Sequence, residues 1–206
     1  MGTESFDLLL ARVRACRDCE ATLPLVPQPV LRASPEAQLL IVGQAPGRHA
    51  HETGVPWNDP SGDRLRSWLQ MDRERFYGDP RIAIVPTGLC YPGRMPRRGG
   101  DAPPCPGCAP KWHPVLRAAM PRIRLTLLVG AYAQAFYLQR RVGRTLADTV
   151  AAGKNFLPQY FPLPHPSPRN IAWFRHHAWF EREIVPELRR QVRWALYPHR
   201  AGSAWA

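Results

Sequence analysis

A short apolar run that leads straight into a glycine- and proline-rich segment is the feature that most constrains the fold. Residues 39–42 read LLIV, which is too short for a typical helix and enriched in branched side chains, so the run predicts a buried β-strand. The pattern stops at Gly43, and the loop that follows leads into a helix predicted from about Gly62 to Leu69. Ligands of α/β folds bind beyond the carboxyl ends of parallel strands, so this loop is the first candidate for a site.

The same kind of run recurs between segments with helical periodicity. Two more apolar runs lie at residues 82–88 and 125–130. Helices are predicted around the runs, at residues 5–16, 62–69, 112–120, 133–138 and 173–188. Short strands that alternate with helices indicate a parallel sheet with helices on both faces. We therefore predict the α/β class, as a three-layer α/β/α sandwich with a central, mainly parallel four-stranded sheet. The proline-rich residues 161–170 are predicted to form a loop.

The length and the charge of the chain indicate how many domains it forms and what kind of partner it binds. With 206 residues the chain can bury one sizeable core, so we expect one domain over residues 1–198 and a tail at residues 199–206 that can be disordered. The 28 Lys and Arg exceed the 16 Asp and Glu, which gives a net charge of +12. Such a charge favours a polyanionic partner, most commonly nucleic acid, with an arginine-rich proteome as the alternative explanation.

Membrane association and secretion are not expected. No run approaches the roughly 18 to 20 apolar residues of a membrane span. Residues 1–16 lack the basic and continuous apolar regions of a signal peptide. We therefore expect a cytoplasmic protein.

The cysteines form two CxxC pairs and one single residue. They are Cys16 with Cys19, Cys105 with Cys108, and Cys90. In a cytoplasmic chain such pairs indicate metal before disulfide. Zinc would take Cys16, Cys19, Cys105 and Cys108 in a tetrahedral site, whereas an iron–sulfur cluster would take four of the five over a wider separation. Free buried thiols are the third alternative.

Four short motifs occur in order along the chain. They are GQAPG at residues 43–47, TGVPW at 53–57, DPSG at 59–62 and HPSPRN at 165–170. Together with the cysteine pattern, they resemble motifs of the uracil-DNA glycosylase superfamily, and within it the iron–sulfur families 4 and 5. The resemblance covers roughly residues 10–190.

The resemblance implies a structural 4Fe–4S cluster. Its ligands would be Cys16, Cys19, Cys90 and Cys108. Cys108 is favoured over Cys105 because it stands just before a predicted helix, as the last cluster cysteine does in the family. Zinc remains the alternative cofactor.

A pocket for a flipped base is also implied. The family places an aromatic ring at the position of Trp57, where it stacks on the base. The residues that the resemblance implies for substrate binding are Gly43, Ala45, Pro46, Gly47, Trp57, Ser167 and Asn170.

Catalytic roles follow from the chemistry of the bond. Cleavage between a deoxyribose and a base develops positive charge on the sugar and negative charge on the base. His165 would donate a hydrogen bond to the base anion, assisted by N–H groups of the turn that begins at Gln44. Asp59 is the first candidate for the carboxylate beside the attacking water, and Glu52 is the second. Alternatively, Asp59 is only a helix cap or turn residue.

Two positions depart from the family pattern. Ala45 stands where the family 1 loop has an aspartate, so a water-activating carboxylate must come from elsewhere or be absent. Pro86 and Thr87 stand where family 4 has an asparagine that reads the uracil edge. An amide that recognises uracil is therefore missing from its expected place.

The leading hypothesis is a DNA repair glycosylase that hydrolyses the N-glycosidic bond of uracil or a related deaminated base in DNA. Its DNA contacts would be Arg94, Arg97 and Arg98 of the long loop, together with Arg169. No obligate protein partner is implied, and such a protein would associate with the nucleoid. The alternative is a non-catalytic binder of uracil-containing or single-stranded DNA.

Overall fold

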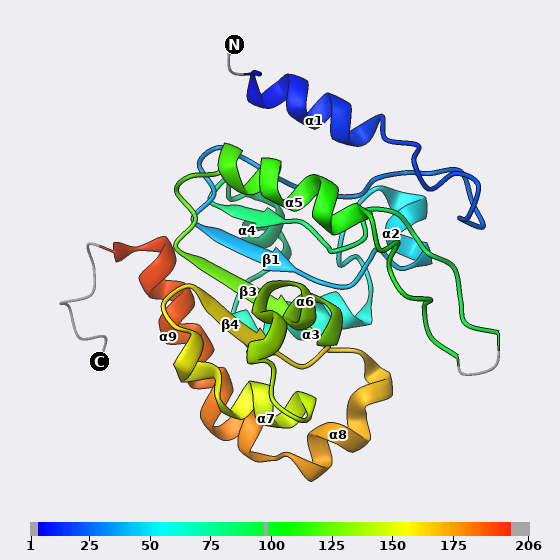
Figure 1. Ribbon diagram of the computed structural model, residues 1–206. Helices are drawn as coiled ribbons and strands as arrows, with labels where there is room; N and C mark the ends of the chain where they lie inside the picture. The colour runs from blue at the N-terminus through cyan, green and yellow to red at the C-terminus, as the bar shows by residue number, and fades with distance from the viewer. Residues whose placement is uncertain (1–3, 97–98, 199–206) are drawn as a thin grey trace.

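The computed structural model describes residues 4–96 and 99–198, and its centre is a parallel β-sheet (Figure 1). The strands are β1 (Leu39–Val42), β2 (Ile82–Ile84), β3 (Leu125–Val129) and β4 (Tyr160–Leu163). Their order in the sheet is β2-β1-β3-β4, and each pair of neighbours is parallel. The predicted fold class is confirmed, whereas the predicted tail at residues 199–206 lies outside the described residues.

Helices cover both faces of this sheet. The α-helices are α1 (Phe6–Arg14), α2 (Arg48–Thr53), α3 (Pro60–Leu69), α4 (Arg73–Gly78), α5 (Cys108–Ala119), α6 (Ala131–Leu138), α7 (Leu146–Ala151), α8 (Ile171–His176) and α9 (Val185–Leu196). Four short helical turns of other types are η1 (Gln139–Arg141), η2 (Gly153–Phe156), η3 (Pro168–Asn170) and η4 (Phe180–Ile184). Figure 1 shows α1 and α5 on one side of the sheet and α9 on the other.

The strand side chains alternate between two hydrophobic clusters, one on each face. Ile41 of β1 belongs to the same cluster as Leu65 of α3 and Leu188 of α9, whereas its neighbour Leu40 belongs to the cluster that contains Leu116 of α5. Successive side chains of a strand point to opposite faces, so a sheet covered on both sides needs apolar residues at every position. This requirement explains why the strands are continuous apolar runs in the sequence.

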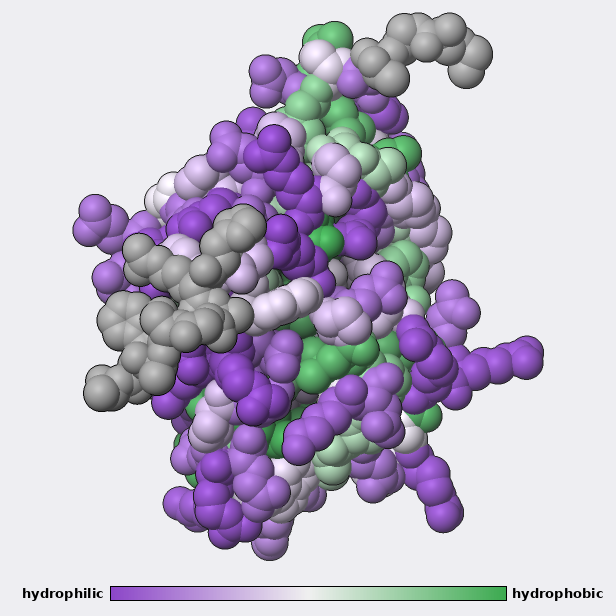
Figure 2. Space-filling model, turned by 90° about the vertical axis from the view of Figure 1, so that its left-hand side faces the viewer, coloured by the Kyte–Doolittle hydropathy of each residue, from purple (hydrophilic) through white to green (hydrophobic). Residues whose placement is uncertain are grey.

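The outer surface contrasts with this core. The face in Figure 2 carries hydrophilic side chains over most of its described area, with apolar side chains visible only in narrow strips between them. Among the described residues, no helix combines the length and the apolar composition needed to cross a lipid bilayer.

Strand β4 corrects the start of the loop predicted at residues 161–170, since the chain leaves the sheet only after Leu163. It pairs with β3 along its whole length, with Pro162 opposite Leu128. Proline cannot donate a hydrogen bond to a neighbouring strand, so it argues against a central strand but is tolerated at an edge. Strand β4 is an edge strand, which is why Pro162 fits there.

Two predictions about helices were also wrong. The loop after β1 contains the short helix α2, which the glycines and prolines around it concealed. The single helix predicted at residues 173–188 is interrupted at His177, between α8 and the turn η4. The His177 ring contacts the carbonyl oxygen of Trp173 at 2.8 Å and stacks on the Trp173 ring, so it occupies the end of α8.

A buried histidine connects α5 with the chain that leaves β2. His113 is 2% exposed, and its Nε2 lies 3.0 Å from the carbonyl oxygen of Pro86. Since a carbonyl only accepts, Nε2 carries the proton, and Nδ1 accepts from the Tyr137 hydroxyl at 2.7 Å. Burial lowers the pKa of His113 to about 4, so the imidazole is neutral when it holds this segment.

His113 is expected to make folding stability pH-dependent. The unfolded chain takes up a proton near pH 6.5, whereas folded His113 does so only near pH 4, so acid favours unfolding between these values. The two pKa values correspond to a loss of about 2 kcal/mol in the free energy of unfolding between pH 7 and pH 5. Urea unfolding at both pH values should show that His113→Gln lacks this component. An equal pH dependence in both proteins would contradict the assignment.

Candidate active site

A cavity of about 310 Å³ opens at the carboxyl edge of the sheet. Its walls come from the loops after β1, β2 and β4, which meet because parallel strands end at the same edge. Of the predicted site residues, it brings together Gly43, Ala45, Pro46, Gly47, Trp57, Asp59, His165, Ser167 and Arg169. We call it the edge cavity. Its size lies at the lower end of the range for small-molecule sites.

The Trp57 ring forms one wall of the edge cavity. It lies so close to Gly43 that a Cβ atom on this glycine would stand 2.8 Å from Cζ2 of the ring. Gly43 thus follows the last residue of β1, and its lack of a side chain leaves space for the Trp57 ring. The ring centroid lies 5.5 Å from that of His165, with the two planes inclined by 35°.

Asp59 has a structural contact and also lines the cavity. It is the N-cap of α3, and its Oδ1 accepts a hydrogen bond from the backbone N–H of Gly62 at 2.8 Å. The other oxygen, Oδ2, lies near Gly47, since a Cβ atom on Gly47 would stand 3.8 Å from it. The two interpretations of Asp59 are therefore compatible, because each carboxylate oxygen can serve one of them.

His165 is held as a neutral hydrogen-bond donor. Its Nδ1 accepts the backbone N–H of Ser167 at 3.2 Å, which assigns the ring proton to Nε2. Burial lowers the pKa of His165, although the nearby Asp59 carboxylate opposes this effect. The Asn170 side chain donates to the carbonyl oxygen of His165 at 2.8 Å. Asn170 does not itself line the edge cavity; it fixes the backbone that carries His165.

Two predicted catalytic residues lie outside the edge cavity. The Gln44 side chain donates to the carbonyl oxygen of Ala102 at 2.9 Å. Glu52 forms an exposed ion pair with Arg48 at 2.8 Å, and this arginine lowers the pKa of Glu52. Gln44 is thus engaged by the long loop before α5, and Glu52 by its own helix, α2.

The predicted DNA contacts are distributed differently. Arg169 lines the edge cavity and is exposed. Arg94 lies outside it and forms an isolated β-bridge with Asp101. Arg97 and Arg98 lie outside the described residues.

Among the other residues that line the edge cavity, Asp101 is a carboxylate that the sequence did not identify as part of the site. Partial burial raises the pKa of Asp101, although Arg169 and Arg94 oppose the shift. No motif contains Asp101, which comes from the long loop before α5, so only the folded chain could reveal it.

The missing amide is not replaced within the cavity. Thr87 is 3% exposed and donates its hydroxyl to the carbonyl oxygen of Gln44 at 2.6 Å, so it holds the loop after β1. Among the described residues that line the edge cavity, none carries an amide side chain. Recognition of a ligand there depends on backbone groups, His165, hydroxyls and carboxylates.

All five cysteines line a second cavity, which we call the cysteine cavity. The Sγ atoms of Cys19 and Cys105 are 2.7 Å apart. Burial and the neighbouring thiols raise the pKa of Cys19 to about 12, and burial raises that of Cys108 to about 11. Thiolates in this cavity therefore need a compensating cation.

Within the described residues, no group of three or more His, Cys, Asp or Glu side chains is arranged to hold a metal ion. The five cysteines that line the cavity nevertheless offer soft thiolate donors, which zinc and iron–sulfur clusters both use.

The fold and the edge cavity together define an α/β protein whose site, beyond the carboxyl ends of the strands, is lined by an aromatic ring, a neutral histidine and two carboxylates. The model of the uracil DNA glycosylase superfamily matches residues 32–189. Because the match covers most of the chain, the protein belongs to this superfamily, which places it among the DNA glycosylases.

Two substitutions distinguish the helix-capping role of Asp59 from the role of its negative charge. Asp59→Asn keeps an Oδ1 acceptor for the N–H of Gly62, so the free energy of unfolding should change by only a few tenths of a kcal/mol. Asp59→Ala removes the acceptor and should cost about 1 kcal/mol. Urea unfolding of both variants checks this, and an equal loss in both would contradict the cap.

Proposed function

We propose that the protein hydrolyses the N-glycosidic bond of uracil or a related deaminated base in DNA. The observation that carries the proposal is a neutral His165, with its proton on Nε2, beside Trp57 and Asp59 in one cavity. Such a site can bind a planar base, stabilise its anion and orient a water.

Base binding is assigned to Trp57. A base inside a duplex is inaccessible, so it must rotate out of the helix into the cavity. Stacking of a base on an aromatic ring contributes about 1 to 3 kcal/mol. The glycine at position 43 leaves room for the ring against the end of β1.

His165 is the proposed donor to the departing base. The N–H of Ser167 and the side chain of Asn170 fix its ring and its backbone before any ligand binds. A preorganised donor of this kind contributes about 3 to 4 kcal/mol to transition-state stabilisation. The lowered pKa of His165 keeps the imidazole neutral, so it donates a hydrogen bond without carrying a full charge.

Asp59 is the proposed partner of the attacking water. Its Oδ1 is engaged by the N–H of Gly62, which leaves Oδ2 to accept a hydrogen bond from water. The water oxygen bonds to the sugar carbon, and one water proton neutralises the released base anion. Glu52 is less suited to this role because it is paired with Arg48 away from the cavity.

Contacts to DNA are assigned to the rim of the edge cavity. Ser167 and the exposed Arg169 lie beside His165 in sequence and line the same cavity. They are placed to bind a phosphate next to the flipped base, a contact that salt weakens.

We further propose that the cysteine cavity holds a 4Fe–4S cluster on Cys16, Cys19, Cys90 and Cys108. When bound, the cluster balances the thiolate charges and ties three chain segments together. A backbone N–H supports one of these sulfurs: that of Leu89 donates to Cys108 at 3.3 Å. Hydrogen bonds of this kind are part of how proteins tune such clusters.

The glycosylase proposal predicts release of a free base. Single-stranded and duplex oligonucleotides that contain uracil, xanthine or hypoxanthine are incubated with the protein, and the released base is quantified. His165→Ala should lower the rate by about 100- to 1,000-fold, because one preorganised donor is lost.

A matched control is His176→Ala, which removes an exposed histidine of α8 that does not line the cavity. It should leave the rate unchanged. Failure of the wild-type protein to release any of the three bases would rule out the enzyme, and tight binding without an abasic product would favour the non-catalytic alternative.

The cluster proposal predicts the metal content. Protein purified without oxygen should contain about four iron and four sulfide per chain. Cys108→Ser should lose them, whereas Cys105→Ser should keep them. Zinc without iron would show that the cavity holds zinc and not a cluster. Loss of iron in Cys105→Ser but not in Cys108→Ser would show that Cys105, and not Cys108, is the fourth ligand.

A further inference from the structure

The aromatic wall of the edge cavity depends on an unfavourable backbone conformation. Trp57 has a φ of +57°, in the left-handed region that bulky L-residues rarely adopt. Such a conformation persists only when surrounding groups hold it. The groups that hold Trp57 therefore help to shape the cavity.

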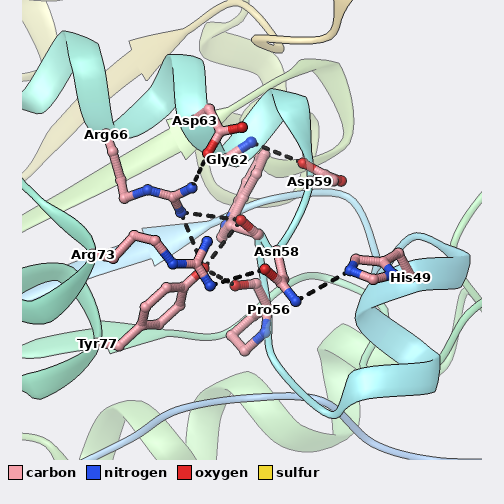
Figure 3. Close-up of polar contacts among 10 residues, drawn as sticks. His49, Pro56, Asn58, Asp59, Gly62, Asp63, Arg66, Arg73 and Tyr77 are labelled. Carbon is pink, nitrogen blue, oxygen red and sulfur yellow. Dashed lines mark hydrogen bonds and ion pairs between the residues drawn. The ribbon is translucent and has the colours of Figure 1, made fainter.

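Arg66 of α3 contacts the backbone of Trp57, and Figure 3 shows its guanidinium close to Asp63 and Tyr77. Although charged, it is only 4% exposed. Its Nη1 donates to the carbonyl oxygen of Trp57 at 3.1 Å and contacts the Tyr77 hydroxyl at 3.0 Å, while its Nη2 pairs with Asp63. Arg66 does not line the edge cavity, and its direct contact with a residue that does is the one to Trp57.

Tyr77 completes the support from α4. Its hydroxyl lies 2.9 Å from the carbonyl oxygen of Pro56 and 3.1 Å from that of Trp57, so it can donate to either while it accepts from Arg66. The guanidinium of Arg66 also lies over the Phe76 and Tyr77 rings, at 5.5 and 5.6 Å from their centroids. A buried guanidinium with this many partners has little freedom to move.

The approach of α3 to this carbonyl is unusually close. A Cβ atom on Gly62 would stand 1.8 Å from the carbonyl oxygen of Trp57. The carbonyl therefore points across the first turn of α3 toward Arg66, with the glycine making room for it.

We propose that Arg66 is a positioning residue, which holds Trp57 in its left-handed conformation and thereby sets the wall on which the base stacks. This inference rests on the proposed function for the role of Trp57, but the physical link between Arg66 and Trp57 stands on the contacts alone. Tyr77 assists by sharing the same carbonyl groups.

The link can be tested without substrate, by NMR of the indole N–H groups. The Trp57 signal is assigned by its absence in Trp57→Phe. Arg66→Met should shift or split this signal, and the milder Tyr77→Phe should shift it less. The matched control is Arg189→Met, since Arg189 also donates to backbone carbonyls of α3, those of Trp68 and Ser67 at its other end. An unchanged Trp57 signal in both Arg66→Met and Tyr77→Phe would overturn the proposal.

A double-mutant cycle then connects the link to binding. Affinity is measured for an oligonucleotide that contains the base released by the wild-type protein. Arg66→Met should weaken binding by about tenfold, because the ring no longer stacks well, and should have no further effect in a Trp57→Ala background. Equal effects in both backgrounds would show a general structural role and overturn the proposal.

The two tests separate two kinds of failure. If the wild-type protein releases no base, the proposed function fails, and the NMR result still decides whether Arg66 positions Trp57. If the wild-type protein releases a base but the Trp57 signal is the same in Arg66→Met and Tyr77→Phe as in the wild type, only the positioning role fails.

Discussion

Two hydrogen bonds from Thr87 join the segments on which both cavities depend. Its backbone N–H donates to the carbonyl oxygen of Gly43 at 2.9 Å, and its hydroxyl donates to that of Gln44 at 2.6 Å. On one side of Thr87, Pro86 lines the edge cavity; on the other, Gly88 and the residues up to Cys90 line the cysteine cavity. A threonine in the place of an expected amide thus serves as a brace between the loops after β1 and β2, and the two cavities share one stretch of backbone.

The sequence predicted what depends on local pattern. Strands buried on both faces are continuous apolar runs, so three of the four strands could be located, whereas Pro162 concealed the edge strand β4. The meeting of Trp57 with His165 could be expected because both follow strands of a parallel sheet. Asp101 could not, because its position depends on how a long loop returns to the sheet. The partner of Gln44, the carbonyl oxygen of Ala102, lies in the same long loop, whereas the Arg48–Glu52 pair has the i,i+4 spacing of a helix and was missed because α2 was not predicted.

Several residues of the site combine a local contact with a place in the cavity. Asp59 caps α3 with one oxygen and presents the other toward Gly47, and His165 is oriented by Ser167 two residues further along the chain. Because these contacts are local, the groups are ordered before a ligand arrives. The entropy of ordering these groups is lost during folding and not during the reaction. Such preorganised groups stabilise the charges of a transition state strongly.

The close approach of Gly62 to the Trp57 carbonyl limits how such a pocket can diversify. Even the smallest side chain at position 62 would overlap the carbonyl oxygen, and one at Gly43 would overlap the ring, so the aromatic wall cannot shift by single substitutions on either side of it. Other positions around the cavity have no such restriction, since residues such as Ser61 and Pro86 already carry side chains there. New ligand preferences would therefore arise by exchange of side chains around a wall that stays in place.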